Sequence, residues 1–213
     1  MLRPKPVGKK IAPHACVPSL AINSPPNQHS RLFLLRCVTP LSAAGFLFSM
    51  GQIVVQELQG TSGSVSDCRF SIVVSKYHHS ITQKLLDGAV QTLTRNLVPA
   101  NQIKTHWVPG AWEIPSAVQR VLDVGDCDSV LTLGCVVRGE TTHDQHINPA
   151  VSNNLGRLAL DYKIPVAFGV LTVNTMDQAI QRAGGEVGNK GIEVAEAAIH
   201  MLLLFKEIQA SQS

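Results

Sequence analysis

Two segments of the sequence carry side chains that could move protons and hold an anion. Thr141 and Thr142 come directly before His143, at the expected start of a helix. The backbone N–H groups of a helix N-terminus, with a threonine cap, form an anion site, and an imidazole there can donate and accept protons near neutral pH. Arg182 and Lys190 flank a run of glycines and could hold phosphate or carbonyl oxygens. This chemistry suits a reaction that combines proton transfer with phosphate binding.

Two further segments could bind a flat heterocycle. Trp112 and Glu113 follow a Val-Pro-Gly turn, which places an apolar plate beside a carboxylate. Tyr77, followed by His78 and His79, is a second candidate plate. Each of the four motifs also has an ordinary interpretation. These are a helix cap with a solvated histidine, a glycine-rich helix break, a turn with a core tryptophan, and a pair of surface histidines.

The same motifs exclude some common sites. The glycine-rich segment is no phosphate loop, because Lys190 is followed by Gly191 rather than Ser or Thr and the segment joins two predicted helices. The dinucleotide-binding pattern G-x-G-x-x-G is absent from the sequence. His143 and His146 are three residues apart and lack a Glu or Cys at a supporting spacing, so we predict no metal site.

The apolar pattern predicts the elements that position these motifs. Short runs rich in β-branched residues predict strands at 70–75, 103–108, 129–135 and 165–172. Apolar residues at steps of three and four predict a helix after each strand. The positions that mark these helices are Ile81, Leu85, Ala89, Leu93 and Leu97; Ile114, Ala117, Val118, Val121 and Leu122; Ile147, Val151, Leu155, Leu158 and Tyr162; and the stretches 176–183 and 192–205.

This alternation predicts an α/β fold. Continuous apolar strands between helices indicate a parallel sheet covered on both faces, which gives a three-layer αβα sandwich with a four-stranded parallel sheet. In such sheets ligands bind beyond the carboxyl ends of the strands. Three of the motifs directly follow predicted strands, and the glycine-rich segment lies among the residues after the fourth strand, so we expect one site at that edge.

The first 49 residues differ from the rest. They are rich in Pro and Ser, and they contain six basic residues and no acidic one. We expect a disordered tail, either a transit peptide or non-native sequence upstream of a start at Met50. Residues 51–59 alternate like an edge strand that could extend the sheet, and 60–64 read as a flexible linker. The domain itself should span 65–208, with a short tail at 209–213.

Composition excludes several partners. Beyond residue 49 the chain holds fifteen acidic and twelve basic residues, which leaves no basic surface for nucleic acid. The most apolar tail stretch, 32–48, is interrupted by Arg36 and Pro40 and is shorter than the roughly 20 residues of a membrane span. Five cysteines without a C-x-x-C pair favour free thiols in a reducing compartment. We expect a cytoplasmic protein, or a plastid one if the tail is a transit peptide.

In order and spacing, four segments resemble the lumazine synthase family. They are Val108–Pro115, Leu133–His143, Val166–Thr172 and Arg182–Gly191, and the resemblance runs over 69–205. It implies a flavodoxin-like fold and an enzyme of riboflavin biosynthesis. The implied reaction condenses 5-amino-6-ribitylaminouracil with 3,4-dihydroxy-2-butanone 4-phosphate to 6,7-dimethyl-8-ribityllumazine. Phosphate and water are released, and neither a cofactor nor a metal takes part.

The resemblance also implies roles for individual residues. His143 becomes the proton shuttle and Arg182 the phosphate-binding cation. The other implied contacts are Tyr77, which stacks on the pyrimidine; Ala111, Trp112 and Glu113 along the ribityl chain; the backbone of Cys135, Val136 and Val137; Glu140 and Thr141 at the phosphate turn; and Phe168 and Lys190, which complete the pocket of a neighbouring subunit.

A homo-oligomer with sites between subunits follows from the same resemblance. The family implies a pentamer and often an icosahedral shell of 60 subunits. The sequence departs from the family pattern at Lys76, at His78 and at 144–146, which leaves the contacts of these residues open. The alternative function is a non-catalytic flavin- or lumazine-binding protein, or a cage protein, on the same fold. His143 and Arg182 argue against it, because a binder needs neither a proton shuttle nor a phosphate cation.

Overall fold

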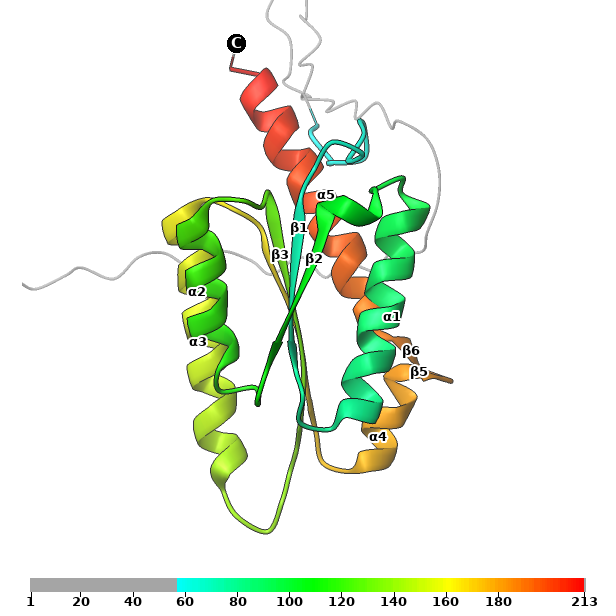
Figure 1. The fold of residues 1–213 in the computed structure, drawn as a ribbon, viewed down its shortest axis with the longest axis vertical. Coiled ribbons are helices and arrows are strands. Elements are labelled where there is room, and N and C mark those ends of the chain that lie inside the picture. Colours follow the sequence, from blue (N-terminus) through cyan, green and yellow to red (C-terminus); the bar gives the residue numbers. More distant parts are fainter. Residues whose placement is uncertain (1–56, 213) are drawn as a thin grey trace, which may run out of the picture. The chain divides into compact units, whose positions relative to one another are not determined.

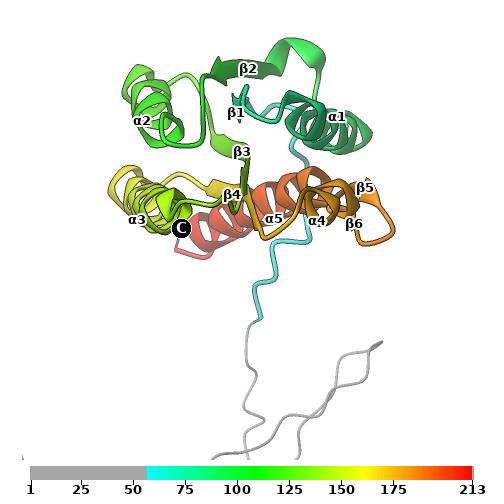
Figure 2. The same ribbon diagram turned by 90° about the horizontal axis from the view of Figure 1, so that it is seen from below.

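A parallel sheet lies at the centre of the computed structural model, which describes residues 57–212. Its strand order is β2-β1-β3-β4. Helices α2 and α3 cover one face, and α1, α4 and α5 cover the other (Figures 1 and 2). The elements are β1 (Phe70–Ser75), α1 (His79–Arg95), η1 (Ala100–Gln102), β2 (Ile103–Val108), α2 (Ile114–Val124), β3 (Ser129–Val137), α3 (His143–Tyr162), β4 (Val166–Val173), α4 (Met176–Gln181), β5 (Ala183–Gly185), β6 (Gly188–Asn189) and α5 (Lys190–Ala210). The predicted three-layer α/β sandwich is confirmed.

The two central strands are buried on both faces. All six residues of β1 are buried, as are eight of the nine residues of β3. Successive β1 side chains point to opposite faces of the sheet. Phe70, Ile72 and Val74 therefore join the core with α1 and α5, whereas Val73 joins the core with α2 and α3. Burial of each such side chain contributes about 1.5–3 kcal/mol, which explains the uninterrupted apolar run.

Helix α1 ends before Leu97, so the prediction that Leu97 belongs to its buried face is wrong. The N–H of Val98 donates to the Leu93 carbonyl (3.1 Å) and the N–H of Leu97 donates to the Thr94 carbonyl (3.0 Å). This bond pair is a Schellman motif, which places Leu97 in the left-handed region at φ 65°. Leu97 is exposed as a result, and Val98 takes the buried position.

Helix α5 starts in close contact with α1. The Asn189 side chain donates to the Lys84 carbonyl in α1 (2.9 Å) and accepts from the N–H of Gly191 (2.8 Å). A Cβ atom at Gly191 would overlap with the Leu85 carbonyl. The close approach of the two helices therefore depends on a glycine at this position.

The glycine-rich segment forms more than a helix break. Strands β5 and β6 pair antiparallel as a small hairpin between α4 and α5. The N–H of Lys190 donates to the carbonyl of Arg182 (2.9 Å) and closes the hairpin. The remaining differences concern element ends: β3 continues to Val137, β4 spans 166–173 rather than 165–172, α4 stops at Gln181, and α5 runs over 190–210 rather than 192–205.

The predicted flexible linker is instead docked on α5. The backbone N–H groups of Gly60 and Ser62 donate to the Glu207 carboxylate, at 3.0 and 3.3 Å. Gly60 is buried at φ 64°, where a Cβ would overlap with the His200 carbonyl. Residues 57–59 form no strand. The predictions for 1–49 and for the first part of the edge strand, up to residue 56, lie outside the described residues.

Candidate functional site

The loops that carry the predicted site residues lie at one end of the sheet, the lower end in Figure 1. Tyr77 follows β1, Trp112 follows β2, and the segment before α3 follows β3. Backbone hydrogen bonds join the first two loops. The N–H of Lys76 donates to the Val108 carbonyl (2.7 Å), and that of Tyr77 donates to the Pro109 carbonyl (3.1 Å). The parallel sheet thus brings distant motifs to one edge, as predicted.

Two aromatic side chains at this edge are exposed. Tyr77 is 67% exposed and Trp112 is 58% exposed, so the interpretation of Trp112 as a core residue is wrong. Glu113 is held by its own turn, because its Oε2 atom accepts from the N–H of Gly110 (2.9 Å). Ala111, the preceding residue, is buried and belongs to the core shared with α2 and α3. Trp112 and Glu113 line a groove of about 690 Å³ between α2 and α3.

The end of β3 presents backbone rather than side chains. Its last register partner in β1 is Leu133 with Val74, and the strand then continues to Val137 beside β4 alone. Backbone groups on the β1 side of Cys135, Val136 and Val137 therefore extend past the neighbouring strand. Burial raises the pKa of the Cys135 thiol to about 11. The thiol stays protonated at neutral pH, so this residue can contribute its backbone but no thiolate.

His143 opens α3, and a threonine holds its ring. The Nδ1 atom of His143 lies 2.6 Å from Oγ1 of Thr141, and the ring packs against Gly139. The Nε2 atom makes no hydrogen bond within residues 57–212, and the side chain is exposed. The predicted threonine cap does not form, because Thr142 at the N-cap position makes no side-chain bond. The Thr141 hydroxyl therefore contacts the imidazole of His143, and no threonine side chain caps a backbone N–H group of the helix.

Arg182 and Lys190 share a carboxylate that sequence reasoning missed. Nη1 of Arg182 lies 2.8 Å from Oε1 of Glu193, and Nη2 lies 3.0 Å from Oε2. Nζ of Lys190 lies 3.0 Å from the same Oε2. Hydrogen bonds from Arg182 and then Lys190 lower the pKa of Glu193. The only sequence signal was the i, i+3 spacing of Lys190 and Glu193 at the start of α5, a common surface pattern.

Phe168 lies apart from the other predicted site residues. It stands in the middle of edge strand β4, in register with Thr132, and is 43% exposed. The other residues lie at or beyond the strand ends. A single chain therefore does not bring Phe168 to its own carboxyl edge.

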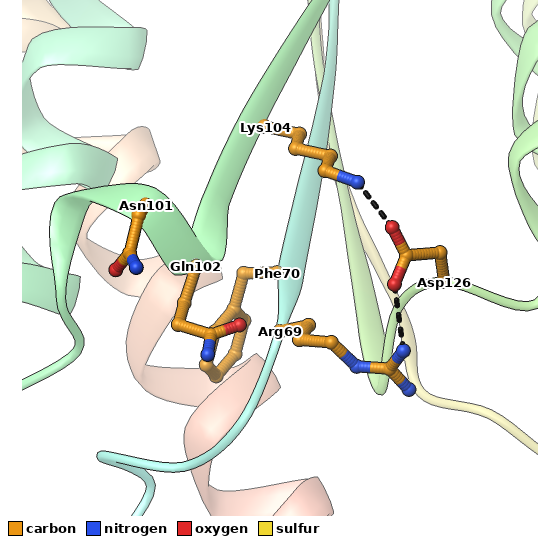
Figure 3. Close-up of a pocket in the computed structure, with 6 residues that line it drawn as sticks. All are labelled: Arg69, Phe70, Asn101, Gln102, Lys104 and Asp126. Carbon is orange, nitrogen blue, oxygen red and sulfur yellow. Dashed lines mark hydrogen bonds and ion pairs between the residues drawn. The ribbon is translucent and has the colours of Figure 1, made fainter.

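A second cavity, of about 200 Å³, lies at the amino end of the sheet (Figure 3). The charged side chains around it form ion pairs. Asp126 pairs with Arg69 (2.7 Å) and with Lys104, and Arg69 also pairs with Asp128 (2.9 Å). These pairs tie the start of β1 to the loop before β3. No predicted site residue lines this cavity, which we assign to the scaffold.

Residues 57–212 contain neither a metal-binding cluster nor a membrane-spanning helix. No group of three or more His, Cys, Asp or Glu side chains in this part of the chain could hold a metal ion. No helix within it is long and apolar enough to cross a membrane. The absence of a cofactor and of a metal in the reaction stays a prediction.

Comparison with known proteins identifies the family. The sequence model of 6,7-dimethyl-8-ribityllumazine synthase matches residues 67–206. This chain belongs to the lumazine synthase family. The protein of that name from Coxiella burnetii (strain RSA 493 / Nine Mile phase I) is 48% identical over 144 residues, which is 68% of this chain and 95% of the relative. The lumazine synthase of Halorhodospira halophila is 40% identical over 156 residues, 73% of this chain and 100% of the relative.

The lumazine synthase match covers all four segments on which the resemblance was based. It begins two residues before Arg69 and ends one residue after Phe205. The predicted family is therefore confirmed. The roles of single residues stay predictions, and the geometry above determines which of them can act together.

Proposed function

We propose that this chain condenses 5-amino-6-ribitylaminouracil with 3,4-dihydroxy-2-butanone 4-phosphate to 6,7-dimethyl-8-ribityllumazine, with release of phosphate and water, in riboflavin biosynthesis. One observation carries the proposal. The family match over 67–206 includes the loops that follow all four strands, and these loops lie at one edge of the sheet. A transferase of two substrates needs such a shared edge, because holding both reactants in place lowers the entropic barrier to their reaction.

The pyrimidine would bind between the first three loops. Tyr77 is an exposed ring that can stack on the heterocycle. Trp112 and the fixed carboxylate of Glu113 would contact the ribityl chain, whose hydroxyl groups are hydrogen-bond donors. The backbone of 135–137, which extends past β1, would pair with the polar edge of the ring. Ala111 closes the pocket behind these residues.

The sugar phosphate would bind at the phosphate turn of Glu140 and Thr141 and at Arg182. The turn lies in the loop before α3 and precedes a helix N-terminus, which favours an anion. Arg182, at the end of α4, would add a cation. Lys190 lies beside Arg182 in the same chain, so we assign both cations to one phosphate site.

His143 would transfer the protons. Imine formation, loss of phosphate and ring closure each need a proton to be moved, and a positioned imidazole accelerates such steps by about 100- to 10,000-fold. Thr141 engages Nδ1, and the exposed Nε2 can take a proton from one reacting group and return it to another.

We also propose that the protein is a homo-oligomer, at least a pentamer, with a pocket between subunits. Helix α3 has twenty residues and buries only Val151 and Leu155. Leu160 on the same helix is 78% exposed, as expected of a surface that another chain covers. Phe168, remote from the edge of its own sheet, would complete the pocket of a neighbour. A 60-subunit shell is a further proposal.

The function is tested by incubating the purified protein with both substrates. Lumazine fluorescence should rise together with released inorganic phosphate, in equal amounts. A non-catalytic binder on this fold would bind added lumazine but would neither form it nor release phosphate. That result would refute the proposed enzymatic activity.

A further inference from the structure

We propose that Glu193 is a positioning residue of the phosphate site. It fixes the guanidinium of Arg182 so that one edge, formed by Nε and Nη2, stays open for two phosphate oxygens. The inference rests on the proposed function of Arg182. Glu193 itself would not contact the substrate.

The argument starts from the five N–H donors of an arginine. Glu193 engages the end of the guanidinium, with Nη1 to Oε1 at 2.8 Å and Nη2 to Oε2 at 3.0 Å. The Val187 carbonyl accepts from Nη1 at 3.1 Å. Nη1 is thereby engaged by Glu193 and Val187, and Nη2 by Glu193. Nε makes no hydrogen bond within residues 57–212, and its hydrogen lies beside one Nη2 hydrogen along a single edge of the planar guanidinium.

That open edge matches a phosphate. Two parallel N–H groups of a guanidinium bind two oxygens of a phosphate or carboxylate in a forked arrangement, which gives geometric specificity as well as strength. Lys190 reaches the same carboxylate at 3.0 Å, and an ammonium has three donors. The group of Arg182, Lys190 and Glu193 keeps one net positive charge for the incoming anion.

Charge and orientation predict opposite effects for the loss of Glu193. Removal of a carboxylate makes the site more positive and on that ground strengthens phosphate binding. However, the side chains of Arg182, Lys190 and Glu193 are 27%, 32% and 43% exposed, so solvent screens this effect. Orientation is not screened. Without Glu193 the long side chain of Arg182 must be ordered by the substrate itself, so we expect weaker binding.

The test uses the full chain, two variants of Glu193 and one control variant. Glu193→Gln removes the charge at nearly constant size, and Glu193→Asp keeps the charge but is one methylene too short to reach both cations. Both should raise the KM of the sugar phosphate, and the inhibition constant of inorganic phosphate, by roughly tenfold. The KM of the pyrimidine and kcat should stay within about twofold. Glu196→Gln, the same change on an exposed residue one turn further along α5, should leave all four values unchanged.

A double-mutant cycle separates positioning from a general structural role. In an Arg182→Ala background, Glu193→Gln should change the KM of the sugar phosphate by less than about twofold, because its effect passes through the guanidinium. Circular dichroism and sedimentation establish that the variants keep the fold and assembly of the parent.

The outcomes are distinct. Absence of turnover by the unaltered protein would refute the proposed function, and an unchanged sugar-phosphate KM in Arg182→Ala would refute the phosphate site. If Arg182→Ala raises that KM while Glu193→Gln leaves it unchanged or lowers it, only the positioning role is overturned. Wild-type behaviour of Glu193→Asp together with a defect in Glu193→Gln would show that the two-point contact of Glu193 with the guanidinium is not needed, and would overturn the positioning role as well.

Discussion

His143 and Thr141 form a local pair at the start of α3. The hydroxyl of Thr141 lies 2.6 Å from Nδ1, and Nε2 makes no hydrogen bond within residues 57–212. The ring is exposed and lies beside Gly139. Chemistry and stability are therefore separable at this residue.

Replacement of His143 with Ala should lower kcat by about a hundredfold or more, because it removes the proton shuttle. The thermal midpoint should change by no more than a degree or two, since the side chain is exposed. Steady-state kinetics and calorimetry measure both quantities. His146→Ala, three residues further along the same helix and also exposed, is the matched control. Near-parental turnover in His143→Ala would remove this residue from the mechanism.

His106 is a residue whose environment affects stability rather than chemistry. It lies on edge strand β2, and its buried Nε2 atom has no hydrogen-bond partner in the described part of the chain. Burial lowers the pKa of the imidazole below its usual value of 6.5, and the charge of Lys104 adds to this effect. At His106 the folded state thus binds a proton less readily than the unfolded state. The contribution of this residue to the free energy of unfolding is therefore fully present above pH 6.5 and is lost as the pH drops through the folded pKa.

The thermal midpoint should therefore fall by a few degrees between about pH 7.5 and about pH 5.5, and less in His106→Gln. Asp126 and Asp128 have pKa values lowered from 3.8, so their contributions are lost at more acidic pH than this window. Exposed His200 provides the control: His200→Gln should keep the parental pH dependence. An identical dependence in His106→Gln and the parent would contradict the assignment.

Among single residues, sequence reasoning located some side chains and missed others. His143 at a helix start follows from the apolar pattern after a strand. The exposure of Trp112 does not, because an aromatic residue near a turn is as compatible with a core as with a surface. Glu193 was missed because its partner Arg182 lies eleven residues away, and only the hairpin brings the two together.

At the scale of elements, the contact between α1 and α5 leaves the least space for an added side-chain atom. Gly191 lies against the Leu85 carbonyl, a backbone atom that cannot rotate aside as a side chain can. The glycine stands at the start of α5, just after the hairpin that Arg182 and Lys190 flank.

Gly191→Ala should destabilise the protein by about 1–3 kcal/mol, the usual cost of overpacking, because α5 must move away from α1. Gly156→Ala is the matched control, since a Cβ at this α3 position meets nothing within 4 Å. That variant should be neutral or more stable by up to roughly 1 kcal/mol, because alanine favours a helix. Denaturant unfolding compares the two. Equal stability of both variants would show that the helices separate without cost.

The strands were predictable because their signal is local. The bounds of β1 and β2 agree with the predicted 70–75 and 103–108, since buried parallel strands are continuous apolar runs. Leu97, Gly60 and the hairpin of β5 and β6 were not predictable in this way. Each depends on backbone hydrogen bonds whose partners the apolar pattern does not identify.

At the scale of the whole molecule, the proposed pocket needs two chains. Phe168 lies in mid-strand on one edge of the sheet, whereas His143 lies beyond the end of β3. If a neighbour supplies Phe168, an oligomer that mixes subunits lacking His143 with subunits lacking Phe168 contains some pockets in which both side chains are present.

His143→Ala and Phe168→Ala subunits, each poorly active alone, should therefore recover activity when they are assembled together. With random mixing, a fraction of the pockets receives His143 from a Phe168→Ala subunit and Phe168 from a His143→Ala subunit. The assay follows lumazine formation after co-refolding, and mass spectrometry verifies the mixed oligomers. No recovery in verified mixtures, or sedimentation of the parent as a monomer, would refute the shared pocket. His143→Ala mixed with His143→Ala/Phe168→Ala subunits is the negative control.

The contact between α1 and α5 joins the first helix of the domain to the last. During translation the chain is made from its N-terminus, so α1 and its apolar residues emerge long before α5 can cover them. Contacts of such large sequence separation form late and slow folding. Lys190 arrives with the same final helix. A ribosome-bound chain that ends before α5 therefore has an open core and an incomplete phosphate site, and both are completed in a single late event of synthesis.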